Sequence, residues 1–491
     1  GWLRTQSFPP PAPRGPCTLP LLRKSRDCQR FRHSEAMTAG PFILGSGFDP
    51  HGFLADVHAA KDAVGPATEA DARHLSSLVA AVQLMTVAGH ALLLLCAARP
   101  LGLVSVSSGL AAAALIAVAR CMRWTVIGHH TSHGGYDKLQ KAQPGALPAQ
   151  YRRGTFGVGW RRFLDWLDWM LPEAWDVEHN KLHHYHLSED KDPDLVERNF
   201  ELLQNMPLPK ALKYASMGIW IASWKATYYS PNTFKELQLS QRQSWLARHW
   251  PASWPANEPV QIGVALQGPL EALRQGRPLD ALFWPVFFSQ WFFAVLPMLI
   301  NVLFPVAVPT FLDAVGLWPQ AVPCAGATWR ALAVVVLAEV LTNAHSFIIV
   351  ACNHSGEDLC RYSTPCKPYS AEWFLRCAYS SANFETGSDV VDSLYGWLNY
   401  QIEHHMFPDM TPLQYRKLQP LMKSVCQKHG VQYVQQNAFF RTWQMLRVAV
   451  GDASMRRCEA VLPPTPAPAS AKPEAAKAEA SSLANGCLIG G

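Results

Sequence analysis

Four long apolar stretches stand out from the pattern of hydrophobic and polar residues along the chain. They cover residues 76–98, 101–119, 281–304 and 331–352. Each is close to the ~20 residues that a helix needs to cross the core of a bilayer. The only charged residue within them is Glu339, in the fourth stretch. We therefore predict four membrane-spanning helices in two hairpins, in preference to buried helices of a large soluble protein.

The charged residues between these stretches predict the orientation in the membrane. Nineteen Lys and Arg residues lie between Arg120 and Asp280 and eleven between Arg361 and Arg457, whereas residues 305–329 contain none. Membrane proteins concentrate Lys and Arg in their cytosolic loops. We therefore place both basic segments and both termini in the cytosol or the plastid stroma. This distribution accounts for the net charge of +6 without a nucleic-acid partner.

The overall composition agrees with an integral membrane protein. Charged residues make up 16% of the chain, against roughly 25% in soluble domains. The twelve cysteines form no C-x-x-C pair, so the sequence predicts neither a disulfide framework nor a zinc ribbon. Residues 156–175 and 214–229 mix Trp and Tyr with basic residues. They lie either flat in the lipid headgroup zone or packed on the cytosolic domain.

The two ends of the chain differ in composition from its centre. Residues 1–36 contain seven Lys and Arg but two acids, which is typical of a transit peptide and fits non-native sequence ahead of Met37 equally well. We assign residues 37–75 to an N-terminal cytosolic or stromal segment, 76–440 to the membrane domain and 441–491 to a tail. From about residue 462 the tail is rich in Pro, Ala, Lys and Glu, and we predict that it is disordered there.

Histidines gather in three short clusters that carry the candidate chemistry. The clusters are His129, His130 and His133; His179, His183 and His184; and His404 and His405. By the predicted topology, all three lie on the same side of the membrane. Members four residues apart share one face of a helix and are expected to bind one ion together, while His184 serves another. This number of histidines exceeds the ligands of a single zinc ion and fits two metal ions.

Acidic residues near the clusters are candidates for orienting the histidines. Metal-bound imidazoles usually donate their second N–H to a carboxylate or carbonyl. The nearby carboxylates are Asp137, Glu178, Asp358 and Glu403. The acidic run at residues 189–194 either orients the metal site or forms a solvated turn, and we favour the turn slightly. We assign no role to His186.

The three clusters resemble the histidine boxes of membrane fatty acid desaturases. The spacing is H-xxx-H at His129, H-xxx-HH at His179 and Q-xx-HH at Gln401, in that order and between two membrane hairpins. The third region, GWLNYQIEHHMFP at residues 396–408, resembles the front-end group, in which Gln replaces the first histidine of the box. The likeness covers roughly residues 75 to 440.

The resemblance implies a diiron site that uses O2 and two electrons to insert a double bond into an acyl chain. Asn353 and His354 match the position of an additional ligand in that family. The implied iron ligands are His129, His133, His179, His183, His184, His354, His404 and His405. Hydrogen-bond partners of the ligands, or weak ligands, are expected among Asn353, His345, Gln401, His130, Glu403 and Asp358. The implied fold is an all-α membrane protein with a cytosolic helical cap that holds the dimetal site.

Two departures from the family pattern affect the expected partners and products. The sequence contains no His-Pro-Gly-Gly haem motif, so we expect electrons from a separate ferredoxin or cytochrome b5 rather than from a fused haem domain. His130 stands where front-end enzymes commonly have Asp, which leaves the position of the double bond open. The substrate is expected to be a fatty acyl lipid or an acyl thioester, in the membrane of the endoplasmic reticulum or plastid.

Other functions remain open on the sequence alone. The same scaffold could act as a diiron lipid hydroxylase or a sphingolipid desaturase. A membrane hydrolase or receptor with a single zinc ion is an alternative of another class, and a purely structural membrane protein is a third. An oxidoreductase that reduces O2 to water accounts best for the number of histidines.

Overall fold

The computed structural model describes residues 42–241, 243–249, 273–276, 278–319 and 321–463. The predicted leader (1–36) and the part of the tail beyond residue 463 lie outside the described residues. Helices make up most of the described chain, and its strands form two short parallel pairs. The predicted helical class is therefore confirmed.

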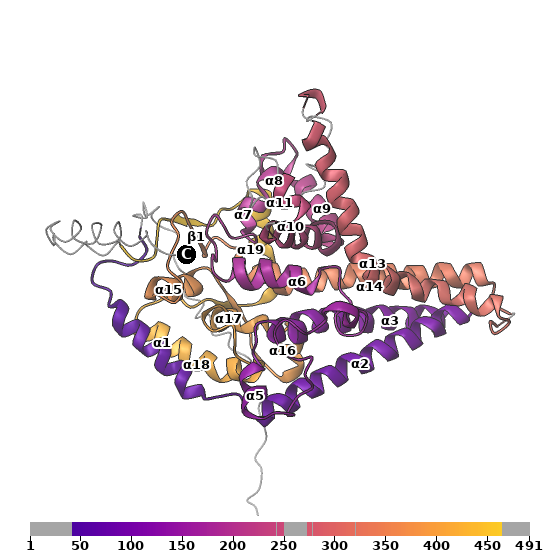
Figure 1. Cartoon of the computed structure of the whole chain (residues 1–491), viewed down its shortest axis with the longest axis horizontal. Coiled ribbons are helices and arrows are strands. Elements are labelled where there is room, and N and C mark those ends of the chain that lie inside the picture. Colours follow the sequence, from indigo (N-terminus) through magenta and orange to yellow (C-terminus); the bar gives the residue numbers. More distant parts are fainter. Residues whose placement is uncertain (1–41, 242, 250–272, 277, 320, 464–491) are drawn as a thin grey trace, which may run out of the picture. The chain divides into compact units, whose positions relative to one another are not determined.

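Four long helices correspond to the predicted spans. They are α2 (Glu69–Ala98), α3 (Leu103–Met122), α13 (Pro278–Ala314) and α14 (Cys324–Val350). Helix α2 packs along α3, α3 along α14, and α14 along α13, and Figure 1 shows the members of each hairpin side by side. Each helix is long and apolar enough to cross a membrane, which confirms the four predicted spans.

Helix α2 begins before the predicted span because its N-terminus is capped. The backbone N–H and the hydroxyl of Thr68 both donate to Asp71 Oδ2, at 2.8 and 2.9 Å. This capping box satisfies donors that the first turn of a helix leaves unpaired. The helix therefore includes the polar residues 69–75 ahead of the apolar stretch.

Helix α13 ends later than predicted. It continues to Ala314, and α14 already begins at Cys324, so the predicted loop at 305–329 is wrong over most of its length. Pro305 and Pro309 lie inside α13 without ending it. Membrane helices tolerate proline because neighbouring groups satisfy the carbonyls that it leaves free.

A buried ion pair joins the two hairpins and explains the single acid in the fourth apolar stretch. Arg120 of α3 donates to Glu339 of α14, and the indole Nε1 of Trp169 donates to the other carboxylate oxygen at 3.0 Å. The charges of both partners are thereby compensated inside the protein, where an unpaired charge would be costly.

Short helices follow α3 and form one side of the cap. In chain order they are η1 (Arg123–Gly128), α4 (His129–Ser132), α5 (Asp137–Ala142), η2 (Gly159–Phe163), α6 (Pro172–Trp175), η3 (Asp176–His183), α7 (Val196–Asn199), α8 (Glu201–Asn205), α9 (Lys210–Ile221), η4 (Lys225–Tyr229), α10 (Ser230–Ser240) and α11 (Trp245–His249). Of these, η1, η3 and η4 are π-helices.

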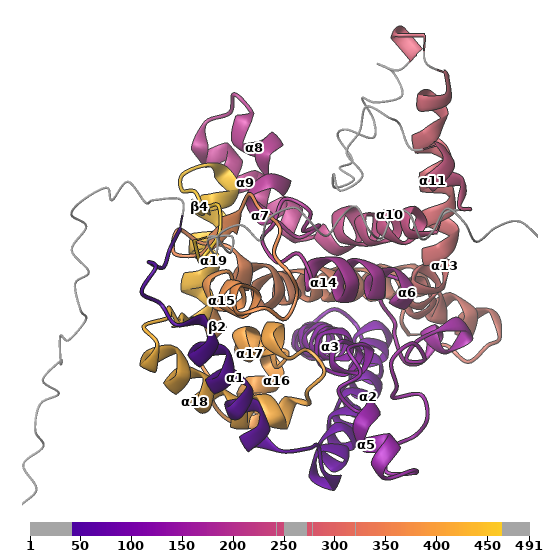
Figure 2. The same ribbon diagram turned by 60° about the vertical axis from the view of Figure 1, so that its left-hand side comes forward.

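The rest of the cap comes from the N-terminal helix and from the chain after α14. Its elements are α1 (Pro50–Val64), η5 (Ala351–His354), β1 (Cys360–Tyr362), α15 (Ala371–Tyr379), β2 (Asn383–Phe384), α16 (Asp389–Leu394), η6 (Leu398–Tyr400), α17 (Gln401–Met406), α18 (Pro412–Lys428), β3 (Gln435–Gln436), α19 (Ala438–Val450) and β4 (Arg456–Cys458). Helix α1 packs on α18 and α15 (Figure 2), while α17, which carries the third histidine cluster, contacts both α15 and α18.

Candidate metal centre

The structure brings the predicted histidines together into two adjoining groups. The five-histidine group consists of His129, His133, His179, His184 and His404, and the three-histidine group of His183, His354 and His405. Within each group, one ring nitrogen per residue lies within 4.8 Å of all the others. All eight side chains are buried. The eight histidines implied as ligands are thus the eight that converge.

The second cluster divides between the groups differently from what its spacing predicts. His179 and His184 belong to the five-histidine group, whereas His183 belongs to the three-histidine group. The reason is that η3 is a π-helix, in which the backbone N–H of His184 bonds the carbonyl of His179 five residues earlier (3.2 Å). His184 therefore joins His179 in the five-histidine group, while His179 and His183 still lie close enough to hold an ion together with Asp194, as their spacing predicts.

The distances between ring nitrogens fit bound cations. The Nε2 atom of His129 lies 2.9 Å from that of His404 and 3.1 Å from that of His179. An imidazole nitrogen sits about 2.1 Å from a transition-metal ion, so two such ligands at right angles are about 3 Å apart. Without an ion, several of these nitrogens would face one another with no proton between them. The donor set is therefore suited to metal binding.

Hydrogen bonds on the far side of the rings select the tautomer that metal binding needs. The Nδ1–H of His183 donates to Asp192 at 2.9 Å, and that of His354 donates to the Ser380 carbonyl at 3.3 Å. The hydroxyl of Tyr415 donates to the Phe407 carbonyl, so its oxygen accepts from the Nδ1–H of His404 (3.1 Å). In each case Nε2 keeps its lone pair for an ion.

Burial sets the protonation of the groups. It lowers the pKa of His133, His179, His184, His404 and His405 well below the usual range, and the neighbouring imidazoles lower it further. These rings are neutral near pH 7, which is the form that binds metal. Burial also lowers the pKa of His183, but the charge of Asp192 outweighs it, so the pKa of His183 is raised.

The contacts of the acidic run at residues 189–194 favour the alternative that it orients a clustered histidine over the solvated turn. Asp192 is 2% exposed, and its carboxylate also accepts from the backbone N–H groups of Ser188 and Asp194. Asp194 lies within 4.8 Å of His179 and His183. No periodicity marks Asp192 in the sequence, because its partner His183 is brought close only by the turn between them.

Two acidic residues that we expected to support the clustered histidines, Glu403 and Asp358, bind other side chains instead. Glu403 accepts from the Tyr433 hydroxyl (2.7 Å) and from the side-chain amide of Asn383 (2.8 Å), and burial raises its pKa to about 7. Asp358 pairs with Arg441 at 2.7 Å. Neither carboxylate has a hydrogen bond to a clustered histidine in the described chain, so their predicted support of the ligands is wrong.

The remaining predicted residues occupy different positions around the groups. Gln401 lies in the three-histidine group, with its amide nitrogen 2.8 Å from Nε2 of His354 and 3.1 Å from Nε2 of His405. His130 donates from Nδ1 to the Val126 carbonyl at 2.8 Å. Outside both groups, the side chain of Asn353 donates to the Leu398 carbonyl (2.9 Å), and a ring nitrogen of His345 contacts the Leu394 carbonyl (2.6 Å).

Among the other residues considered, His186 hydrogen-bonds Glu189 at 3.0 Å and joins neither group. Asp137 accepts from the backbone N–H of Arg153 (3.2 Å), and Glu178 accepts from the Tyr229 hydroxyl (3.3 Å).

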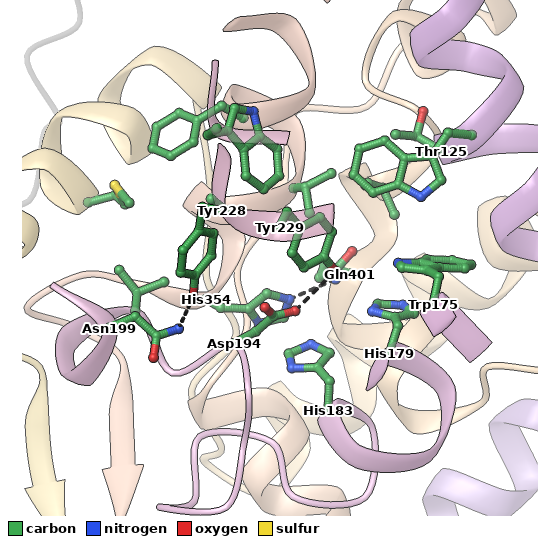
Figure 3. Close-up of a pocket in the computed structure, with 18 of the residues that line it drawn as sticks. Thr125, Trp175, His179, His183, Asp194, Asn199, Tyr228, Tyr229, His354 and Gln401 are labelled. Carbon is green, nitrogen blue, oxygen red and sulfur yellow. Dashed lines mark hydrogen bonds between the residues drawn. The ribbon is translucent and has the colours of Figure 1, made fainter. Parts of the chain in front are cut away.

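An apolar cavity ends on both histidine groups. Figure 3 shows His179, His183 and His354 at one end, with Tyr228 and Tyr229 pointing toward them. Aromatic and aliphatic side chains line most of the remainder, among them Trp124, Trp175, Trp220, Trp224, Phe347, Leu398 and Met445. Such a lining suits a hydrocarbon chain and keeps bulk water from the histidines.

Comparison with known proteins gives a consistent set of matches. A family model described as "Fatty acid desaturase" matches residues 105–437. A segment of 63 residues is 44% identical to fatty acid desaturase 2-like protein FADS2B of Mus musculus, and covers 13% of each chain. A segment of 69 residues is 32% identical to sn-1 linoleoyl-lipid 6-desaturase of Arthrospira platensis, and covers 14% of this chain and 19% of that one. The matched segments thus span less than a fifth of these relatives. No solved structure matches significantly.

Proposed function

Because the chain belongs to the fatty acid desaturase family, we propose that it inserts a double bond into a fatty acyl chain at two iron ions. The observation that carries this proposal is the pair of buried histidine groups at the end of an apolar cavity. Bound iron would supply the strong oxidant, formed from O2 and two electrons, that an unactivated methylene group requires.

The eight converging histidines would hold the ions, one in each group. The five-histidine group offers a full set of nitrogen ligands, whereas the three-histidine group leaves coordination positions free. The amide of Gln401 lies beside those positions. We propose that it shapes this side of the site or admits a water, because an amide is a weaker ligand for iron than imidazole.

The protein itself would bind and orient the acyl chain. The cavity wall contributes few polar groups besides the histidines, Asp194 and Gln401. A hydrocarbon chain would bury apolar surface there and exclude water from the reaction. Electrons are expected from a separate ferredoxin or cytochrome b5.

A second cavity, here called the outer hollow, supports a route by which an acyl chain could reach the apolar cavity at the histidines, here called the inner cavity. It lies between α8 and α9 and shares the wall residues Phe200, Trp220 and Tyr228 with the inner cavity. Its rim is apolar and exposed at Leu208 and Ile219. Trp220 also contacts Phe347 near the end of α14, with ring centroids 5.8 Å apart. We propose that an acyl chain passes from the membrane boundary through this wall.

Expression in yeast fed defined fatty acids, with and without ferredoxin, tests the proposed activity. We expect a new unsaturated product by mass spectrometry and near two iron ions per purified chain. The His404→Ala variant should lose both, whereas His51→Ala, which changes an exposed histidine outside the groups, should keep both. A product heavier by one oxygen atom would identify a hydroxylase, and one zinc ion per chain without new product would contradict the proposal.

The proposed route has its own test. Ser216 lines the outer hollow, and Ala215 beside it is exposed and does not. Ser216→Trp should block the hollow and lower product formation, while Ala215→Trp should leave it near the wild-type level. Equal product formation by both variants would remove the hollow from the route without affecting the proposed activity.

A further inference from the structure

Arg123 in η1 is a buried arginine that forms no ion pair with a carboxylate of the described chain. Four arginines are buried in the described chain, and three of them, Arg120, Arg376 and Arg441, pair with carboxylates. Arg123 is 8% exposed and has no carboxylate within ion-pair distance among the described residues. A buried charge without a partner is strongly unfavourable, so we expect an anion to bind beside this arginine.

The neighbours of Arg123 satisfy only part of its hydrogen-bonding capacity. One terminal nitrogen donates to the Leu164 carbonyl, and the other donates to the Thr86 hydroxyl at 3.1 Å. Its Nε is buried and has no partner. The nearby carboxylate of Asp165 is already paired with Arg161 at 2.5 Å. Donors of the guanidinium and one net positive charge therefore remain available.

Two cavities, of about 350 and 460 Å³, meet at Arg123. The first lies between α2, α3 and α13 and is lined in part by Ile116 and Asn301. The second lies between α2, η1 and the segment 150–167 and includes Phe156 and Arg161. Both are bordered by Thr86, Val87, Arg123 and Leu167. Most of the lining is apolar, so a small inorganic anion would not fill it.

The segment that borders the second cavity has side chains typical of the edge of a bilayer. Helices α2 and α3 are candidate spans, and the adjoining segment around η2 exposes Trp160 (67%) and Leu164 (56%). The guanidinium of Arg161 lies 5.5 Å from the ring of Trp160. Tryptophan beside arginine is typical of the headgroup zone.

We propose that the two cavities bind one membrane glycerophospholipid. Its phosphodiester would lie beside Arg123, and one acyl chain would occupy the cavity between α2, α3 and α13. This site is separate from the acyl cavity at the histidines, which is bordered by the next two residues of η1, Trp124 and Thr125, but not by Arg123. The bound lipid is therefore distinct from the substrate, and the proposal does not depend on desaturase activity.

Native mass spectrometry of the purified full-length protein tests the site. The probes are phosphatidylcholine, a galactosyl diacylglycerol with the same acyl chains but no phosphate, and inorganic phosphate. We expect one tightly retained phosphatidylcholine, little retention of the galactolipid, and no displacement of the phospholipid by millimolar inorganic phosphate. Equal retention of the galactolipid, or displacement by inorganic phosphate, would overturn the proposal.

Two variants and a matched control locate the bound lipid. Arg123→Gln removes the charge and should weaken phospholipid binding about tenfold or more. Arg162→Gln changes a neighbouring arginine that pairs with Glu173 outside the cavities, and should bind like wild type. If Arg123→Gln fails to fold, Val87→Trp places a larger side chain at the border of both cavities and keeps the charge, and it should also weaken lipid binding. Wild-type retention by the folded variants would refute the site.

Discussion

Replacement of Asp192 by Asn should weaken metal binding at the three-histidine group. The carboxylate accepts three hydrogen bonds: one oxygen from the Nδ1–H of His183 (2.9 Å) and the N–H of Asp194 (2.9 Å), the other from the N–H of Ser188 (2.7 Å). Asparagine has the same shape but only one accepting oxygen. One N–H must then face an NH2 group, in a place that is 2% exposed.

The expected size of the effect follows from two contributions. Loss of one buried hydrogen bond destabilises the folded protein by about 1–3 kcal/mol. Loss of the negative charge behind His183 makes the imidazole a weaker ligand, and changes of this kind lower metal affinity about 10- to 100-fold, or about 1.4–2.7 kcal/mol. The five-histidine group has no hydrogen bond to Asp192 among the described residues, so its ion should stay bound.

Iron titration against a competing chelator measures this effect directly. Asp192→Asn should lose about one of the two proposed ions at a chelator concentration that leaves wild type loaded. Asp190→Asn is the matched control, because Asp190 belongs to the same acidic run but pairs with Arg361 and its side chain is 63% exposed. If Asp192→Asn held iron as tightly as both wild type and the control, Asp192 would have no part in orienting His183.

Further predictions concern the amide ligand position, the topology and a buried ion pair. Gln401→Ala should keep more iron than His404→Ala, and Gln401→His should keep iron but turn over more slowly; equal iron loss in Gln401→Ala and His404→Ala would make the amide a direct ligand. Leu317 is 73% exposed between α13 and α14. A cysteine in its place should react with a membrane-impermeant thiol reagent in sealed vesicles only from the side opposite the histidines. Labelling from the cytosolic side would contradict the four-span topology. Asp168→Asn should lower the free energy of unfolding by about 3–5 kcal/mol, measured by denaturant titration, because it leaves the buried Lys225 without its partner; a change within error would show that the ion pair is dispensable.

The features predicted correctly are those with a local signal. An apolar run of span length shows in a window of residues, and the closely spaced histidines show in a motif a few residues long. Both signals can be recognised from sequence because each depends on residues within one short window. The convergence of the three clusters also followed from topology, since the alternating spans return them to one side.

The errors concern backbone register and distant partners. Periodicity assumes an α-helix, so it could not reveal that η3 is a π-helix and that His184 joins His179 in the five-histidine group. Glu403 adjoins the third histidine cluster in sequence, but the helix turns its side chain toward Tyr433. Arg123 gives another example, because only the packed structure reveals that its charge has no ion-pair partner among the described residues.

The three π-helices share a position that suggests why the fold retains them. Each contributes two residues to the wall of the apolar cavity: Trp124 and Thr125 from η1, His179 and His183 from η3, and Tyr228 and Tyr229 from η4. A π-helix is rare because its backbone is less favourable than an α-helix, and it occurs most often at functional sites. The wider turn changes the direction of successive side chains. Arg123 and Lys225 can therefore reach partners outside the cavity wall from the same turns that supply its aromatic lining. The same π-helices thus supply both the apolar lining of the cavity and the buried charged side chains Arg123 and Lys225 beside it.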